Sequence, residues 1–306
     1  INTAYIDAGS MPDNRYNETR YYSDNDSLAF STLTYFDANK VVTNTSEGND
    51  TEFVSYGEII DYAIVIDVPK GFVNITINDI LPNGFELIEG SLVLSDGTVL
   101  TRDNYTLNGR QLNIVLDVVV IDQPLVVNYK CIVVNDVAKN PVGQLKTNVA
   151  TVTWFDKVTS KANVTIVSPN AYVTKIYNVT TVEGLDGVEL VISATNTGNS
   201  VLYNATIIDD LTDLITKFVN KDDLNITIVE GNETGKLVSS WNGNVIKFYM
   251  DELDAAKSIV IKFTFNVKAD VKIGVTHDNK VDFYGYSVSD DTKYVKNFTD
   301  DDIDRF

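Results

Sequence analysis

Short segments of alternating apolar and polar residues, separated by turn residues, most constrain the fold of this chain. β-Branched and aromatic residues dominate these segments, and helical periodicity is nearly absent. This spacing is typical of sandwiches of antiparallel strands, so the sequence predicts an all-β protein. One short helix is expected within residues 209–218. Strands are predicted at residues 59–68, 73–80, 111–120, 125–134, 148–155, 188–194, 203–209, 245–250 and 258–267.

One strand pattern occurs twice in the 306 residues. The segment "VNITIND" ends at Asp79, and "YNATIID" ends at Asp209, with Asn, Thr, Ile and Asp at matching places. Each copy also has an early Lys and a late strand that starts with Asn. We therefore predict two tandem sandwich repeats, over residues 38–168 and 169–290, followed by an acidic tail at 291–306.

The first 37 residues differ from both repeats and are predicted to form an N-terminal extension. Its end, "SLAFSTLTYFD" at 27–37, resembles the closing strand "NVATVTWFD" at 148–156. A strand without a partner needs a sheet edge to pair with. Two interpretations stay open: the segment 27–37 packs on its own chain, or it is a donor strand for a neighbouring subunit.

The acidic composition argues against several classes of function. With 43 Asp and Glu against 24 Lys and Arg, the net charge is −19, which disfavours a nucleic-acid partner. Cys131 is the only cysteine, so no disulfide can form within the chain, and the single histidine, His277, disfavours a zinc site or a Ser-His relay. Acidic clusters such as 289–304 match no calcium-loop signature and are interpreted as solvated surface, with calcium as the weaker alternative.

No motif for an enzyme or a cofactor is present. We find no phosphate loop, nucleophile elbow or paired-carboxylate scaffold, and we expect a non-enzymatic protein without cofactors. No apolar run is long enough to span a membrane. The chain begins at Ile1 without a charged and then apolar leader, and it is interpreted as a mature or trimmed segment of a longer precursor.

Acceptor sequences for N-linked sugars are abundant. Their excess predicts a glycosylated, extracellular protein of the cell surface, although an Asn- and Thr-rich β protein also generates such sequences by chance. The twelve acceptors are Asn17, Asn25, Asn44, Asn49, Asn74, Asn104, Asn163, Asn178, Asn204, Asn225, Asn232 and Asn297.

Strand parity places three polar residues of each repeat among apolar ones. Asp79 shares a strand face with Ile75 and Ile77, and the other members of each set follow the same alternation. Charged groups are rarely buried unless they are paired. The candidate interior sets are Lys40, Asp79 and Asn148 in the first repeat and Lys175, Asp209 and Asn279 in the second.

Covalent chemistry is one explanation of these sets. Burial favours the neutral amine of Lys and the protonated acid of Asp, and a neutral amine can attack a polarised Asn carboxamide. Ammonia would leave, and an isopeptide bond would join two strands. Glu58 and Asp186 are the competing acids. The alternative is an ordinary buried salt bridge, with Asn capping backbone groups.

Several segments mark the two repeats: the first contains "GEIIDYAIVIDVP", "NDILPNGF" and "NVATV", and the second contains "NTGNSVLYNATIIDDL" and "NKVDF". With these segments, both repeats resemble the immunoglobulin-like repeats of bacterial and archaeal surface adhesins and pilins. Some members of this group form Lys–Asn isopeptide bonds assisted by an acid. The second repeat departs from the pattern, because Asp210 rather than a Pro-x-Gly turn follows Asp209.

The resemblance implies two tandem immunoglobulin-like sandwiches and a structural role. We expect a glycosylated module or subunit of a surface filament, pilus or cell-surface layer that associates with identical subunits, with strand donation as one mode of assembly. The alternative is an adhesin stalk or a module that binds a ligand on a host or neighbouring cell. A polysaccharide-active enzyme is the least supported class. Sequon density together with the resemblance favours an archaeal source.

Overall fold

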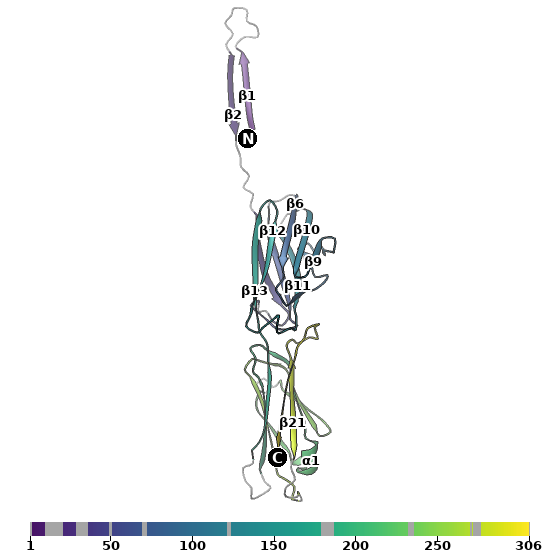
Figure 1. Cartoon of the computed structure of the whole chain (residues 1–306). Helices are drawn as coiled ribbons and strands as arrows, with labels where there is room; N and C mark the ends of the chain where they lie inside the picture. Colours follow the sequence, from purple (N-terminus) through teal and green to yellow (C-terminus); the bar gives the residue numbers. More distant parts are fainter. Residues whose placement is uncertain are drawn as a thin grey trace, which may run out of the picture.

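The fold of the chain is all-β (Figure 1). The structure is a computed structural model that describes residues 2–9, 21–28, 36–48, 51–68, 72–120, 124–178, 187–231, 236–269, 271 and 277–305. All nine predicted strands are present, and the predicted short helix is α1 (Thr212–Lys217). The alternation of apolar and polar residues therefore predicted the fold class and nine of the strands correctly.

The N-terminal extension contains a hairpin of β1 (Asn2–Gly9) and β2 (Tyr21–Leu28). Ser27 and Leu28, the first two residues of the candidate donor strand, pair with β1 of the same chain. Residues 29–35 lie outside the described residues, and strand β3 starts at Asp37. Donation of segment 27–37 to another subunit therefore stays a prediction.

The first sandwich packs two sheets face to face. One has the order β3-β5-β11-β7, with β8 beside β11, and the other has the order β4-β13-β12-β6-β10-β9. The predicted closing strand, β12, is followed by one more strand, β13, which pairs with it along its whole length. The bounds are β3 (Asp37–Thr45), β4 (Phe53–Val54), β5 (Ile59–Asp67), β6 (Phe72–Ile80), β7 (Phe85–Leu87), β8 (Val93–Leu94), β9 (Tyr105–Asn108), β10 (Gln111–Val120), β11 (Leu125–Val133), β12 (Leu145–Thr153) and β13 (Lys157–Ile166).

The second sandwich repeats this plan. Its sheets have the orders β14-β15-β20-β17 and β18-β19-β16-β21-β22. The prediction of an acidic tail at residues 291–306 is wrong in part, because residues 297–305 form strand β22, which pairs with β21. The bounds are β14 (Ala171–Asn178), β15 (Val188–Asn196), β16 (Leu202–Asp210), a 3₁₀ turn (Lys221–Asp223), β17 (Asn225–Glu230), β18 (Val238–Asn242), β19 (Val245–Leu253), β20 (Ser258–Phe265), β21 (Asp278–Tyr286) and β22 (Asn297–Arg305).

Alternate residues of each central strand build the cores. In β15, for example, Val188, Leu190, Ile192 and Ala194 are buried while the residues between them are partly exposed. Each fully buried Leu or Ile contributes about 1.5–3 kcal/mol relative to an exposed one. A shift of one residue in register would turn this whole set toward solvent, so the alternation fixes the pairing.

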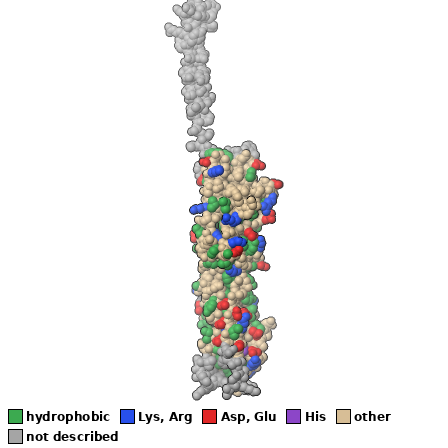
Figure 2. Space-filling view, viewed as in Figure 1, with side chains coloured by type: hydrophobic (Ala, Val, Ile, Leu, Met, Phe, Trp, Pro, Cys, Tyr) green, Lys and Arg blue, Asp and Glu red, His purple; other side chains and the backbone are tan. Residues whose placement is uncertain are grey.

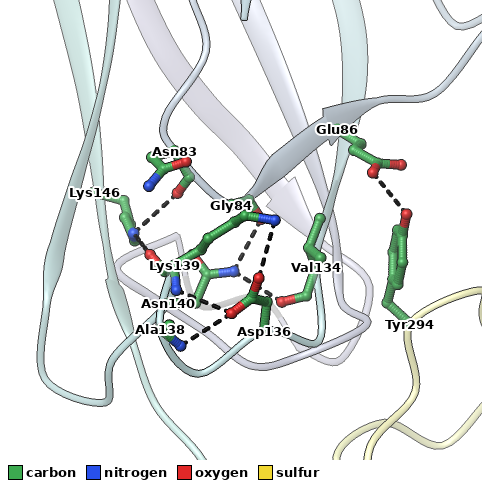
Figure 3. A network of polar contacts seen from close by, with 10 residues as sticks. All are labelled: Asn83, Gly84, Glu86, Val134, Asp136, Ala138, Lys139, Asn140, Lys146 and Tyr294. Carbon is green, nitrogen blue, oxygen red and sulfur yellow. Dashed lines mark hydrogen bonds and ion pairs between the residues drawn. The ribbon is translucent and has the colours of Figure 1, made fainter. Parts of the chain in front are cut away.

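The two sandwiches are stacked end to end, and the turn between β21 and β22 contacts the first sandwich (Figure 1). Ser287 Oγ donates to the Tyr56 carbonyl at 2.5 Å, and Thr292 Oγ1 donates to the Gly57 carbonyl at 2.8 Å. Tyr294 OH donates to Glu86 Oε1 at 2.6 Å (Figure 3). These bonds add to the four-residue link between β13 and β14, so the junction is held at several points.

Side-chain bonds also close the base of the first sandwich (Figure 3). Asn140 Nδ2 donates to the Gly84 and Val134 carbonyls at 2.9 and 2.8 Å, and Lys146 Nζ donates to the Asn83 carbonyl at 2.9 Å. Gly84 has a φ of +86°, and a Cβ there would lie 2.3 Å from Asn140 Oδ1. Only glycine fits this close approach without strain.

Acidic and basic side chains are interspersed on the face of the sandwiches seen in Figure 2. The charge excess is therefore not gathered into one patch on that face. Within the described ranges, no helix has the length and apolar character that crossing a bilayer requires.

Candidate crosslinking site

The three candidate residues of the first repeat meet inside the sandwich. Lys40 lies on β3 in one sheet, whereas Asp79 on β6 and Asn148 on β12 lie in the other. Lys40 is 2% exposed, and the other two are 0% exposed. Lys40 Nζ forms an ion pair with Asp79 Oδ2 across the core. The parity argument thus placed all three side chains on the correct face.

A tyrosine hydroxyl lies at the centre of this group. Tyr129, on β11, has its OH 2.5 Å from Lys40 Nζ and donates to Asp79 Oδ2 at 2.5 Å. Asn148 Nδ2 donates to the same hydroxyl at 2.8 Å. The Lys amine and the Asn amide therefore share one hydrogen-bond partner, which holds the two groups close to each other.

The second repeat brings together the equivalent set. Lys175 Nζ on β14 lies 2.5 Å from Asp209 Oδ1 on β16, and both side chains are fully buried. Asn279, on β21, is 1% exposed, and its Nδ2 donates to Tyr177 OH at 3.2 Å. Tyr177 lies on the same strand as Lys175, two residues further on.

Strand register shows that the two sets occupy identical places. Asp79 faces Ala150 on β12, and Asp209 faces Val281 on β21. In both cases the facing residue comes two positions after the candidate Asn. Diagonal neighbours of this kind are within reach of each other's side chains.

Burial changes the ionisation of both pairs in the same direction. Desolvation lowers the pKa of Lys40 and of Lys175, and the facing carboxylate opposes this effect in each case. Desolvation likewise raises the pKa of Asp79 and of Asp209, opposed by the partner Lys. Both shifts favour the neutral amine and the neutral acid over the charged pair.

Four buried oxygens of the two sites accept no hydrogen bond from any described residue. They are Asp79 Oδ1 and Asn148 Oδ1 in the first repeat and Asp209 Oδ2 and Asn279 Oδ1 in the second. Buried acceptors are normally satisfied. A proton on the free carboxyl oxygen would supply a donor that could polarise the neighbouring amide carbonyl. This arrangement can activate the Asn carboxamide toward a nucleophile.

The competing acid of the first repeat does not join the site. Glu58 is buried, but its carboxylate accepts from the backbone N–H groups of Ser55 and Glu47, at 2.8 and 3.3 Å, in the loops around β4. These hydrogen bonds hold the loops on either side of β4 in place. Asp186 lies outside the described residues.

Comparison with known proteins adds little beyond architecture. No protein-family model matches the chain, and no curated protein matches it. Among solved structures, the chain is similar to a C-terminal fragment of the major pilin of Streptococcus agalactiae, at 12% identity and a TM-score of 0.33, over 87% of this chain and 91% of that one.

A second similar structure contains manganese lipoxygenase of Gaeumannomyces graminis and part of zonadhesin of Komagataella pastoris. The identity is 12% and the TM-score is 0.31, over 88% of this chain and 93% of the matched one. The assignment to the all-β class rests on the sheets of the chain itself.

A row of aspartates beside the second site was not foreseen. Asp300, Asp302 and Asp304 of β22 accept the backbone N–H groups of Val173, Lys175 and Tyr177 at 2.8, 2.7 and 2.7 Å. In the first repeat Ser160 Oγ of β13 accepts the Lys40 N–H at 2.9 Å. We call the row Asp300–Asp304 the carboxylate seam. The sequence feature that could have revealed this row is the Asp at every second position from 300 to 304.

None of the eight sugar acceptors whose side-chain exposure is described is buried. Asn104 and Asn204 are half-buried, and Asn25 belongs to strand β2. Asn17, Asn49 and Asn232 lie outside the described residues. Glycosylation stays a prediction. The exposed acceptors are Asn44, Asn74, Asn163, Asn178, Asn225 and Asn297.

Two remaining candidates are buried side chains. Cys131 is fully buried in the first core. His277 is 2% exposed, and its ring centroid lies 5.7 Å from that of Phe218. Within the part of the chain that the structure describes, no group of His, Cys, Asp and Glu could hold a metal ion.

Proposed function

We propose that this chain is a structural extracellular protein whose two sandwiches each carry an intramolecular Lys–Asn isopeptide bond. It would serve as a glycosylated module or subunit of a surface filament, pilus or cell-surface layer. One observation carries the proposal: the same Lys, Asp and Asn are buried at the same register in both repeats. An ordinary core has no need of a charged pair and an unsatisfied amide in two copies.

The crosslink would connect the two sheets of each sandwich. In the first repeat it joins β3 to β12, and in the second it joins β14 to β21. A chain with a single cysteine has no internal disulfide with which to do this. An amide bond also holds the two sheets together regardless of redox conditions.

Intact mass spectrometry after deglycosylation tests the crosslinks. The expected mass of the wild-type chain is lower than its sequence mass by one ammonia molecule for each bond. The variants Asn148→Ala and Asn279→Ala should each lose one ammonia molecule fewer than the wild type. The control is Asn113→Ala, which removes a contact with Asn78 outside both sites and should lose as many ammonia molecules as the wild type. A wild-type mass equal to the sequence mass would refute the crosslinks.

Assembly and display are the two uses that this module could have. Self-association through residues 27–37 predicts that deletion of residues 1–37 gives folded monomers that no longer polymerise. Fibres like those of the full chain, formed by the truncated chain, would refute strand donation. The end-to-end junction of the sandwiches favours the second candidate, a stalk that holds another domain away from the cell. A rod-shaped full-length monomer without self-association would support that role.

A further inference from the structure

We propose that Tyr129 is a catalytic residue of the first repeat, whose hydroxyl carries a proton from the Lys40 amine to the departing nitrogen of Asn148. This inference rests on the proposed crosslink and adds a group to it. Neither strand parity nor the repeat pattern pointed to this tyrosine. Its position between the two reacting nitrogens is what identifies it.

The contacts of the hydroxyl use its full hydrogen-bonding capacity. A phenol has one donor and two acceptor sites. Tyr129 OH donates to Asp79 Oδ2 and accepts from Lys40 Nζ and Asn148 Nδ2, at 2.5, 2.5 and 2.8 Å. The residue is 1% exposed, so bulk water cannot easily carry the proton instead. Burial raises the pKa of Tyr129 well above its usual value, which keeps the phenol protonated.

The proton balance of the reaction needs such a group. Transfer of one proton from the Lys40 ammonium to the Asp79 carboxylate gives a neutral amine and a neutral acid. The amine lone pair then forms a bond to Cγ of Asn148. The attacking nitrogen must lose a proton, and Nδ2 must gain one before it can leave.

Tyr129 can meet both needs once Asp79 is protonated, because the phenol hydrogen, which points to Asp79 Oδ2 before the reaction, can then turn toward Nδ2. Its oxygen takes the proton from Nζ while its own proton passes to Nδ2. The bond between Cγ and Nδ2 breaks, ammonia leaves, and Tyr129 is a neutral phenol again. Asp79 has a separate task, because its free oxygen can polarise the Asn148 carbonyl oxygen, which has no other described donor.

The second repeat provides an internal comparison. Tyr129 faces Tyr62 across the β11–β5 pair, and the same place in the second repeat is Phe263, which faces Leu190. Phenylalanine has no hydroxyl to relay a proton. Tyr177 reaches Asn279 from a different place, on the strand that carries Lys175. We therefore expect the first repeat to react faster than the second.

The test uses the full chain made by cell-free translation and sampled over time. Each sample is digested, and the branched peptide of each repeat is quantified by mass spectrometry. Tyr129→Phe should slow ammonia loss in the first repeat by about 10²–10⁴-fold and leave the second repeat unchanged. The matched control is Tyr56→Phe, which also removes a buried hydroxyl, one that donates to the Asn140 carbonyl at 2.8 Å.

The outcomes separate this inference from the proposed crosslink. If Tyr129→Phe reacts at the wild-type rate, the role of Tyr129 is refuted and the crosslink stands. If the wild type loses no ammonia in either repeat, both are refuted. Should Tyr129→Phe fail to fold, 3,5-difluorotyrosine at this position keeps the hydroxyl but makes it more acidic. A relay predicts a changed rate there, and an unchanged rate would refute it.

Discussion

Replacement of Asp302 by alanine tests the carboxylate seam. The carboxylate is half-buried and accepts the Lys175 backbone N–H at 2.7 Å. Lys175 lies on β14, an edge strand whose other neighbour is β15. Without the carboxylate, that N–H loses its acceptor on the β22 side of the strand.

The expected cost follows from this geometry. A hydrogen bond to a charged group contributes about 1.5–3 kcal/mol, and the half-exposed position favours the lower end, about 1.5–2 kcal/mol. Asp302→Ser should cost less, because Ser160 makes the corresponding contact to Lys40 N in the first repeat at 2.9 Å. A neutral acceptor retains about 0.5–1.5 kcal/mol.

Hydrogen exchange at the Lys175 amide is the most direct assay, because it reports opening of this strand irrespective of any crosslink elsewhere. A cost of about 1.5–2 kcal/mol corresponds to a rise in the exchange rate of about 10- to 30-fold. Asp302→Ser should lie between the wild type and Asp302→Ala. The matched change Ser160→Ala should speed hydrogen exchange at the Lys40 amide and leave exchange at the Lys175 amide unchanged. If Asp302→Ala changes exchange less than about twofold, the seam does not stabilise β14.

Three further predictions concern other buried groups. Lys40→Ala should destabilise the first sandwich by about 3–5 kcal/mol in denaturant unfolding, since it leaves Asp79 buried without its Lys partner and removes the proposed crosslink; a loss below about 1 kcal/mol would contradict this. Burial lowers the pKa of His277, so the unfolded chain binds its proton more readily, and stability should fall as pH drops below about 6.5. His277→Phe should remove that part of the pH dependence of Tm, and an unchanged profile would count against it. Gly84→Ala should cost about 1–3 kcal/mol, through its positive φ and the clash with Asn140, whereas near-neutral unfolding would show that the turn can relax.

The sequence predicted the interior members of the site because they obey the alternation of their strands. Lys175 stands between Thr174 and Ile176 and shares a face with Val173, so its burial could be read from four consecutive residues. The duplicated strand that ends in Asp supplied an independent check.

The parts that could not be predicted depend on pairings between strands far apart in the chain. Tyr129 alternates like any core tyrosine, and only its register against β5 and its distance to Lys40 distinguish it. The carboxylate seam was interpreted as a solvated acidic run, because a side chain that caps the backbone of another strand leaves no apolar residue to mark the buried face. The strand β22 was missed for the same reason.

The contact between the β21–β22 turn and the first sandwich has a consequence for biosynthesis. Ser287 and Thr292, which bind the Tyr56 and Gly57 carbonyls, are made more than a hundred residues after the link at Pro169. During translation the first sandwich is complete while the residues that clamp it have yet to emerge. The full set of contacts at the junction therefore forms only after the final hairpin has been synthesised.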